Sequence, residues 1–268
     1  MKHLLIIILA CAISGSVTLA NTLTVGTGQT YTTIQSAVNA ASVGDTIKVL
    51  PGIYNEAINI NKNVVVQGSG YETTRIMSAN DPTITMSTGK IMWFSITSTA
   101  GDGASVSGGI ITNCVIAGCA RNGVSFSPSS TGSIKNCVLI GNARNGADHS
   151  SFFYSGGSAV NCISWRNGGY GFSGLAGVTY CDGWVDGSGS NNINSDPIFV
   201  SGNDFHILPT SPCFQTGNPA DVNPDGSRSD MGYFGGSDCP IYPVVTKIVI
   251  IPSGNGQVQI QATAQANY

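Results

Sequence analysis

Three arginines recur at a nearly constant spacing, each at the start of the tripeptide Arg-Asn-Gly. They are Arg121, Arg144 and Arg166, and the steps between them are 23 and 22 residues. If the chain repeats one structural unit at this interval, the three guanidinium groups stack about 4.8 Å apart. Like charges at that distance repel, so the pattern predicts an anionic partner. The planar guanidinium matches a carboxylate, such as that of a uronate sugar. The alternative is that the side chains extend into solvent or pair with Asp148 and Asp182.

Aromatic residues gather near the last two of these arginines. The group comprises His149, Phe152, Phe153, Tyr154, Trp165, Tyr170 and Trp184. Exposed aromatic faces stack on sugar rings, so Trp165 and Tyr170 join the arginines as predicted ligand-binding residues. The alternative is ordinary packing of the core and the turns. Asp148 and His149 are the candidate acid–base pair of a catalytic site, with Arg166 as a third candidate.

A group of oxygen ligands lies near the C-terminal end. Asp221, Asn223 and Asp225 occupy alternate positions and a glycine follows, as in the first half of an EF-hand loop. The bidentate glutamate of such a loop is missing, and Asp230 is the candidate to replace it. The loop therefore predicts calcium as the one candidate cofactor, in a bracing role. The alternative is a series of Asx turns in a surface loop.

A second repeat shows which elements must position these residues. Cys114, Cys137 and Cys162 are separated by 23 and 25 residues and lie in short, strand-like segments. Such segments recur along the chain at Val64–Val66, Ile91–Ile96, Ile110–Ile116, Ile134–Ile140, Val160–Ile163 and Val178–Cys181. A period of 20–25 residues predicts a solenoid of stacked coils, and we expect about six to eight coils of roughly 22 residues.

The column of cysteines predicts how the inside of the solenoid is filled. Cys114, Cys137, Cys162 and Cys181 are expected to stack inward as small apolar residues, and Phe94 is expected to precede them in the same column. Asn113, Asn136 and Asn161 each precede a column cysteine. Their amides are expected to bond to one another and to the backbone of the turns.

The two ends of the solenoid have their own signals. Residues Thr32–Ala41 carry apolar side chains at helical spacing, which predicts an amphipathic helix that covers the first coil. Cys213 and Cys239 lie outside the repeats, in a loop-rich tail, and are the predicted disulfide pair, whereas Cys119 is unassigned. Thr246–Ile251 and Gln257–Ala264 predict a β-hairpin. The hairpin either closes the far end of the solenoid or begins a further domain.

Composition favours an exported β-rich protein. Only 9% of the residues are charged, 41% are hydrophobic and 35 are glycine, which argues against both a helical protein and a disordered one. The net charge of −3 argues against nucleic acid as a partner. The polar start, apolar core and small residues of positions 1–20 predict a signal peptide, with a lipoprotein signal at Cys11 as the alternative. No other long apolar stretch follows, so we expect a soluble, secreted monomer without a transmembrane segment.

Several segments resemble a known superfamily. Thr33-Ile-Gln-Ser-Ala-Val-Asn-Ala-Ala, Gly44-Asp-Thr-Ile and Gly52-Ile-Tyr-Asn-Glu are similar to the first coil of pectin methylesterases and other secreted parallel β-helix proteins. The stretch from Asp196-Pro-Ile-Phe-Val to Tyr233-Phe-Gly-Gly resembles the ending of bacterial β-helix proteins that carry interchangeable C-terminal surface anchors. The resemblance to this pectin-lyase-like superfamily implies a right-handed parallel β-helix.

The catalytic motifs of the superfamily are missing. The chain has no equivalent of the Gln, the two Asp and the Arg of pectin methylesterases, nor of the paired aspartates and Gly-His-Gly of polygalacturonases. It has no acidic residue between Asp102 and Asp148, where calcium-dependent pectate lyases cluster theirs. An enzyme of these known types is therefore disfavoured.

The sequence thus predicts an all-β protein, a single-stranded right-handed parallel β-helix with an N-terminal capping helix and an irregular tail that ends in a hairpin. Its expected parts are a signal peptide (1–20), the β-helix (21–200), a disulfide-braced tail (201–240) and the hairpin or a truncated domain (241–268). The predicted function is binding of extracellular or cell-wall polysaccharide without a recognisable catalytic site. One alternative is a polysaccharide lyase or glycosidase acting on an acidic glycan, and the other is a structural surface or adhesin module.

Overall fold

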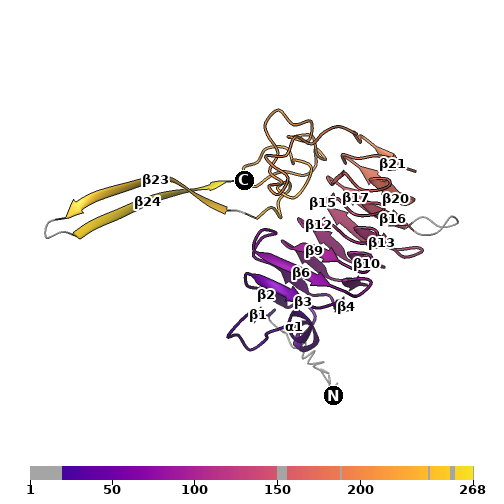
Figure 1. The fold of residues 1–268 in the computed structure, drawn as a ribbon, viewed down its shortest axis with the longest axis horizontal. Coiled ribbons are helices and arrows are strands. Elements are labelled where there is room, and N and C mark those ends of the chain that lie inside the picture. The colour runs from indigo at the N-terminus through magenta and orange to yellow at the C-terminus, as the bar shows by residue number, and fades with distance from the viewer. Residues whose placement is uncertain (1–19, 150–155, 188, 241, 254–256, 268) are drawn as a thin grey trace, which may run out of the picture.

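A computed structural model describes residues 20–149, 156–187, 189–240, 242–253 and 257–267. Residues 1–19 of the predicted signal peptide and the aromatic residues Phe152, Phe153 and Tyr154 lie outside this part of the chain. The described residues form a parallel β-helix whose coils contribute strands to three parallel sheets of nine, six and seven strands, here called A, B and C (Figure 1). This confirms the parallel β-helix predicted from the repeats, and the seven strands of sheet C agree with the expected number of coils.

The strands are short and follow one another in the order A, B, C around each coil. Sheet A holds β1 (Thr22–Val25), β2 (Thr46–Val49), β5 (Val65–Gln67), β8 (Lys90–Met92), β11 (Ile110–Thr112), β14 (Ser133–Lys135), β17 (Gly156–Val160), β20 (Leu175–Thr179) and β22 (Gly189–Ser190). Sheet B holds β3 (Gly52–Asn55), β6 (Thr74–Ser78), β9 (Ser95–Ser98), β12 (Val115–Ala117), β15 (Val138–Ile140) and β18 (Ile163–Trp165). Sheet C holds β4 (Ile58–Ile60), β7 (Ile84–Met86), β10 (Ala104–Val106), β13 (Val124–Phe126), β16 (Ala147–His149), β19 (Phe172–Ser173) and β21 (Val185–Asp186).

Columns of apolar side chains fill the inside of the coils, because equivalent residues of parallel strands stack in register. One column of sheet A is Ile47, Val66, Ile91, Ile111 and Ile134. The predicted column at the corner between sheets A and B is confirmed: Phe94, Cys114, Cys137, Cys162 and Cys181 are all fully buried. Burial raises the pKa of the Cys114, Cys137 and Cys162 thiols. These cysteines therefore remain neutral and pack as small apolar residues.

The predicted helix covers the first coil. It is α1 (Ile34–Ala40), it begins at the N-cap residue Thr33, and it buries Ile34, Ala37 and Val38 in the main core. The carboxylate of Glu56 accepts the N–H groups of Ile34 and Gln35 at 2.8 and 2.9 Å, which satisfies two donors of the first turn. Within the described residues, no helix is long and apolar enough to cross a membrane.

The turn from sheet A to sheet B is a single residue in the left-handed backbone region. Asn113, Asn136 and Asn161 occupy it with φ of 45°, 48° and 54°, a conformation that asparagine tolerates better than most residues. The expectation that their amides bond to one another is wrong. Each side chain points outward and bonds to the tail: Asn113 donates to the carbonyls of Tyr233 and Gly235 at 2.6 and 2.9 Å.

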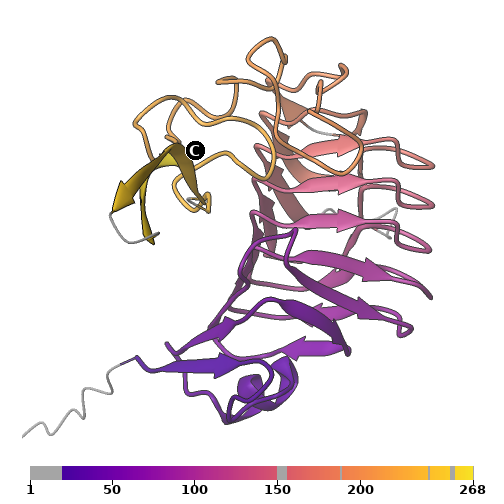
Figure 2. The ribbon, with the colours of Figure 1, turned by 60° about the vertical axis from the view of Figure 1, so that its left-hand side comes forward.

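The tail lies over the outer face of sheet B and forms a second small core with it. Val115, Val138 and Ile163 of the sheet pack with residues of the tail and of one early loop, which are Tyr71, Phe205, Cys213, Met231, Tyr233, Phe234 and Cys239. Two ion pairs fasten the tail to sheet A, Lys90 with Asp238 at 2.6 Å and Lys135 with Asp221 at 2.7 Å. The C-terminal part of the chain therefore covers sheet B at β12, β15 and β18 (Figure 2).

The predicted disulfide between Cys213 and Cys239 is not formed in the structure, where both thiols are free and buried. The Cys213 Sγ donates to the Asp182 carboxylate at 3.1 Å, and the Cys239 Sγ lies 3.5 Å from the carbonyl of Pro240. Burial raises the pKa of Cys239 to about 12 and also raises the pKa of Asp182. Buried packing, hydrogen bonds and ion pairs hold the tail in place of a covalent link.

The hairpin is longer than predicted and points away from the coils. Strands β23 (Tyr242–Ser253) and β24 (Gln257–Asn267) pair antiparallel with each other. Figure 1 shows them projecting from the tail, far from the last coil. The interpretation that the hairpin closes the far end of the solenoid is therefore wrong.

Candidate functional site

The predicted ligand-binding arginines all lie on one edge of the solenoid, where the chain turns from sheet B to sheet C. We call this the B-to-C edge; in three successive coils it comprises residues 118–123, 141–146 and 166–171. A ladder of polar side chains fixes these turns. The Asp81 carboxylate accepts the backbone N–H of Asp102 at 3.0 Å, and the Asp102 carboxylate accepts that of Asn122 at 2.9 Å. The Asn122 and Asn145 amide oxygens continue the ladder to Asn145 and Tyr170, at 3.0 and 2.8 Å.

A column of glycines follows the ladder because the coils approach closely there. A Cβ added to Gly103 would lie 2.6 Å from the carbonyl oxygen of Gly123, and one added to Gly123 would lie 2.6 Å from that of Gly146. Sequence reasoning missed this ladder. Its signal was present, since Asp102, Asn122 and Asn145 are each followed directly by glycine at the coil period.

Arg121 is occupied by the protein itself. Its guanidinium contacts the Asp81 carboxylate at 2.5 Å and the Asp102 carboxylate at 3.2 Å. Asp102 is only 7% exposed, so Arg121 compensates a nearly buried charge. The carboxylates of Asp81 and Asp102 therefore take the place of the external anion that the sequence pattern predicted.

Arg144 lies directly beside Arg121, whereas Arg166 does not continue their column. The N–H of Arg144 donates to the carbonyl of Arg121 at 3.0 Å, and the next residue in that row is Gly169. Arg166 instead stacks on Gly118 and Gly141, and all three adopt positive φ, of 53°, 63° and 64°. The predicted single column of arginines is therefore wrong, because the third Arg-Asn-Gly lies three residues earlier in its coil than the other two.

Arg144 and Arg166 are nevertheless exposed neighbours on the same edge. Both side chains are open to solvent, and neither forms an ion pair with any described residue. The predicted partners do not bind them: Asp148 accepts from the Asn145 amide at 2.9 Å, and Asp182 is fully buried under the tail. Two cationic groups in adjacent coils are thus free to bind an anion.

The aromatic residues of this region divide between two faces. Tyr170 lies on the B-to-C edge and contacts Trp184 of the next coil edge-to-face, with ring centroids 4.8 Å apart. Trp184 is 62% exposed, an unusual state for so large an apolar surface. Trp165 is half-buried and packs against the second core under the tail. Tyr170 and Trp184 therefore provide the aromatic surface of the edge, and Trp165 lies on the other side of the turn.

A groove of about 390 Å³ runs beside the arginines over sheet C. Its lining is polar and comprises Asp102, Ser105, Arg121, Asn122, Ser125, Ser127, Arg144 and Asp148, with Phe126 and Pro128. Ser105, Ser125 and Asp148 are equivalent residues of adjacent strands, so their side chains form one outward row. We call this hollow the arginine groove.

The two residues of the candidate acid–base pair lie on opposite faces of one strand. Asp148 and His149 are consecutive in β16, so their side chains point to opposite faces of sheet C. Asp148 lines the arginine groove, whereas His149 follows Phe126 in the inward column and is only 5% exposed. Neither ring nitrogen of His149 bonds to a described residue. The two groups cannot serve one substrate together.

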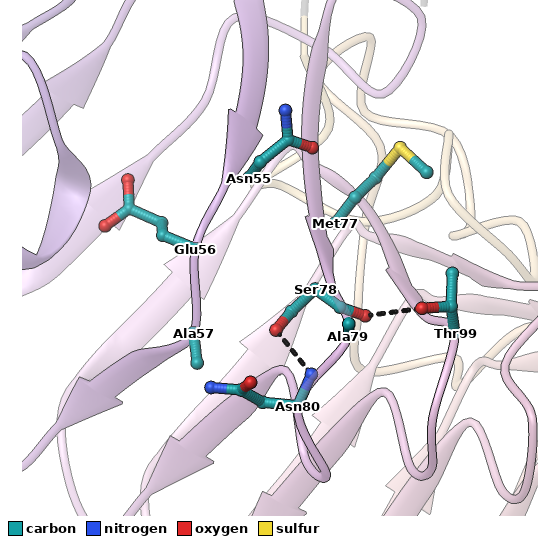
Figure 3. A pocket seen from close by; sticks show the side chains of 8 residues that line it. All are labelled: Asn55, Glu56, Ala57, Met77, Ser78, Ala79, Asn80 and Thr99. Atoms are coloured by element: carbon teal, nitrogen blue, oxygen red, sulfur yellow. Dashed lines mark hydrogen bonds between the residues drawn. The ribbon is translucent and has the colours of Figure 1, made fainter.

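A second hollow lies on the same edge, nearer the N-terminal end. It has a volume of about 450 Å³ and is lined by Asn55, Glu56, Ala57, Met77, Ser78, Ala79, Asn80 and Thr99 (Figure 3). The Asn80 N–H donates to the Ser78 hydroxyl at 2.9 Å, and the Thr99 hydroxyl donates to the Ser78 carbonyl at 3.2 Å. These bonds fix the loop around the hollow, which we call the amide hollow.

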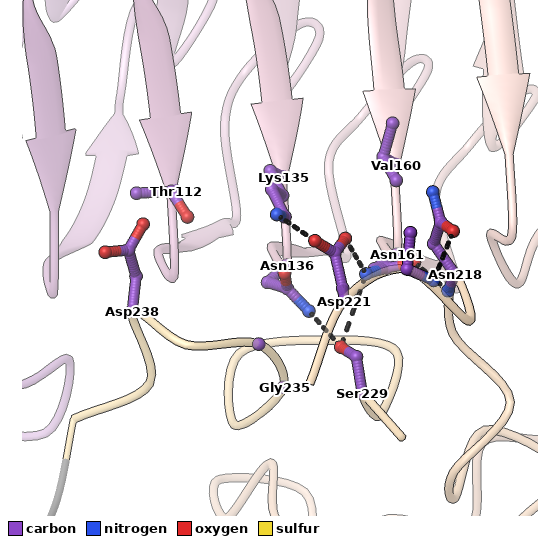
Figure 4. Close-up of polar contacts among 12 residues, drawn as sticks. Thr112, Lys135, Asn136, Val160, Asn161, Asn218, Asp221, Ser229, Gly235 and Asp238 are labelled. Atoms are coloured by element: carbon purple, nitrogen blue, oxygen red, sulfur yellow. Dashed lines mark hydrogen bonds and ion pairs between the residues drawn. The ribbon is translucent and has the colours of Figure 1, made fainter. Parts of the chain in front are cut away.

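The predicted calcium ligands are engaged with other groups. Asp221 binds Lys135 at 2.7 Å and accepts from the Asn161 amide at 3.1 Å (Figure 4). Hydrogen bonds from the Ser227 side chain and then from its N–H lower the pKa of Asp225, and Asp230 accepts the N–H of Gln215. No group of three or more His, Cys, Asp or Glu side chains suited to a metal occurs among the described residues. Calcium binding stays a prediction, and the loop's visible role is to dock the tail.

The chain was compared with protein families, curated protein sequences and solved structures. No family model and no curated protein sequence matches the chain. Among solved structures, a pectin methylesterase from Aspergillus niger is 17% identical with a TM-score of 0.41, over 64% of this chain and 84% of that one. A pectin methylesterase from carrot is 14% identical with a TM-score of 0.42, over 65% and 79%. The pectate lyase Pel9A is 11% identical with a TM-score of 0.39, over 82% and 97%.

Proposed function

We propose that the protein is a secreted polysaccharide-binding protein that holds an acidic glycan along the B-to-C edge without cleaving it. The observation that carries the proposal is the pair of exposed arginines, Arg144 and Arg166, in adjacent coils beside the exposed ring of Trp184. Guanidinium groups bind carboxylates in forked geometry, and an aromatic face packs on the apolar side of a sugar ring. The combination suits a glycan rich in uronate.

Binding is favoured over catalysis by the chemistry of the arginine groove. Asp102 accepts hydrogen bonds from Arg121, from the N–H of Asn122 and from the Ser125 hydroxyl, and these bonds favour its charged form as a fixed partner of Arg121. Asp148 remains, but its sequence neighbour His149 points into the core. General acid–base catalysis needs a proton acceptor and donor that reach the same bond, and the groove does not assemble such a pair from the described residues.

The test is retention of the protein on immobilised polygalacturonate. We expect the double variant Arg144→Ala/Arg166→Ala to bind about 10–100-fold more weakly, because hydrogen bonds to charged groups contribute about 1.5–3 kcal/mol each and exposure reduces that value. The difference should shrink at high salt, since exposed charges are screened.

The control is Arg75→Ala, which removes an exposed arginine from β6 on sheet B and should not change retention. No new reducing ends or unsaturated products should appear during incubation. Chain cleavage that disappears in Asp148→Asn would replace the proposal with the polysaccharide lyase or glycosidase alternative. If the wild-type protein does not bind any acidic glycan, the proposal fails and the alternative of a structural surface or adhesin module remains.

A further inference from the structure

The amide hollow offers hydrogen-bonding groups that the fold does not use. Asn55 and Asn80 are exposed, and their side-chain amides have no partner among the described residues. Each carboxamide provides two donors and one acceptor oxygen. The backbone of Asn80 is fixed by the Ser78 and Ser98 hydroxyls at 2.9 and 2.8 Å, so its free side chain projects from a rigid loop. Two pre-positioned amides facing one hollow suit a ligand with several hydroxyl or amide groups.

Part of the lining is apolar. Met77, Ala57 and Ala79 contribute methyl and thioether surface between the two amides. The flexible thioether of methionine adapts to irregular apolar shapes. Sugar rings present this same division, with hydroxyl groups at the rim and C–H bonds on the faces. The hollow therefore has the chemistry of a site for one sugar unit.

Electrostatics select the kind of sugar. The lining contains no lysine, arginine or histidine. Its only charged residue is Glu56, whose carboxylate accepts the first two N–H groups of α1 and points away from the hollow in Figure 3. A uronate here would find no cation in the lining and would lie near the Glu56 carboxylate. An uncharged sugar unit carries no such penalty.

The two hollows lie next to each other along the edge. Asn80 is followed directly by Asp81, whose carboxylate binds Arg121, and Arg121 lines the arginine groove. The edge extends through six coil steps from Asn55 to Trp184, which corresponds to about 29 Å at the strand spacing of a parallel sheet. A linear glycan of several units can therefore lie across both hollows.

We propose that the amide hollow binds an uncharged sugar unit of the same glycan whose acidic units reach Arg144 and Arg166. The inference rests on the proposed function and narrows the ligand class to polysaccharides that contain both neutral and uronate sugars. It assigns the neutral part to the N-terminal end of the edge and the acidic part to the C-terminal end.

The experiment compares the binding of two glycan probes to the protein by calorimetry. Hyaluronan oligosaccharides alternate glucuronate with N-acetylglucosamine, whereas oligogalacturonates of matched length contain uronate alone. We expect Asn55→Ala/Asn80→Ala to bind hyaluronan about tenfold more weakly, as for the loss of two neutral hydrogen bonds, and to bind oligogalacturonate like the wild type. Arg144→Ala/Arg166→Ala should weaken both. The control Asn203→Ala removes an exposed asparagine of the tail and should change neither.

The outcomes separate the two proposals. If Asn55→Ala/Asn80→Ala binds hyaluronan like the wild type while the arginine variant does not, the amide hollow is no subsite and the proposed function stands. If the asparagine variant loses affinity for both probes equally, the assignment of a neutral unit to the hollow is wrong. If the wild type binds neither probe, the proposed function fails and this inference fails with it.

Discussion

Replacing Tyr233 by alanine is expected to release the tail from sheet B while the coils stay folded. The ring is 1% exposed and contacts Tyr71 and Phe234 edge-to-face, with centroids 4.7 and 4.8 Å apart. Its hydroxyl accepts the N–H of Tyr71 at 3.1 Å. Removal of a buried aromatic side chain costs about 3–5 kcal/mol. Because the coils keep their own core, this loss falls mainly on the docking of the tail.

Hydrogen exchange measures this effect residue by residue. The amide of Met231, which bonds to the carbonyl of Cys213 at 3.0 Å, should exchange about 100-fold faster or more in the variant. The amide of Val124, inside sheet C, should keep its wild-type rate. Tyr233→Phe is the matched control and should give a smaller effect, because it removes the hydroxyl and leaves the ring. Equal acceleration of tail and coils would show that the two form a single cooperative unit.

Replacing Arg121 by alanine is expected to destabilise the coils by about 1–3 kcal/mol, the range for leaving a buried acceptor without its partner. The charge of Asp102 raises this cost, and the partial exposure of Arg121 lowers it. Asp102 is nearly buried and shares Arg121 with Asp81, so the variant leaves two carboxylates together without a cation. Arg144→Ala, one coil further, is the control and should change stability by less than about 0.5 kcal/mol, because Arg144 is exposed and forms no ion pair with the described residues.

The acidic pair provides a rescue experiment. Asp102→Asn in the Arg121→Ala background should recover much of the loss, because Asn122 and Asn145 already perform the same ladder function with a neutral amide. Denaturant unfolding of the four proteins forms a double-mutant cycle. Additive effects of the two substitutions would mean that Arg121 does not act through Asp102.

The fold was predictable because the coils of a solenoid repeat the same pattern of residues along the sequence. Cys114, Cys137 and Cys162 recur at the coil period with strand-like neighbours, and equivalent residues of parallel strands must stack. Long-range contacts were not predictable in the same way. Nothing near Asn113 or Asn136 in sequence indicates that a segment about a hundred residues later binds their amides. The asparagine amides bond to the tail instead of to one another, because the tail places backbone carbonyls next to these turns.

The sequence indicated only some of the residues that form the candidate site. Arg144, Arg166 and Tyr170 lie on one edge, whereas Trp165, which was predicted to join them, packs against the second core. The role of Arg121 depended on Asp81 and Asp102, which belong to earlier coils. The error over Arg166 has a visible origin. The cysteine and arginine repeats differ by three residues in their last step, 25 against 22, so both patterns could not stay in register.

The central claim, that the B-to-C edge binds an acidic glycan, is tested most directly by hydroxyl-radical footprinting with and without polygalacturonate. Trp184 is 62% exposed and should be oxidised readily in the free protein. We expect the glycan to protect Trp184 and Tyr170, whereas Tyr31 near the N-terminal helix should be oxidised equally in both samples. Unchanged oxidation of Trp184 in a sample where the glycan is demonstrably bound would contradict the account and place the binding surface elsewhere.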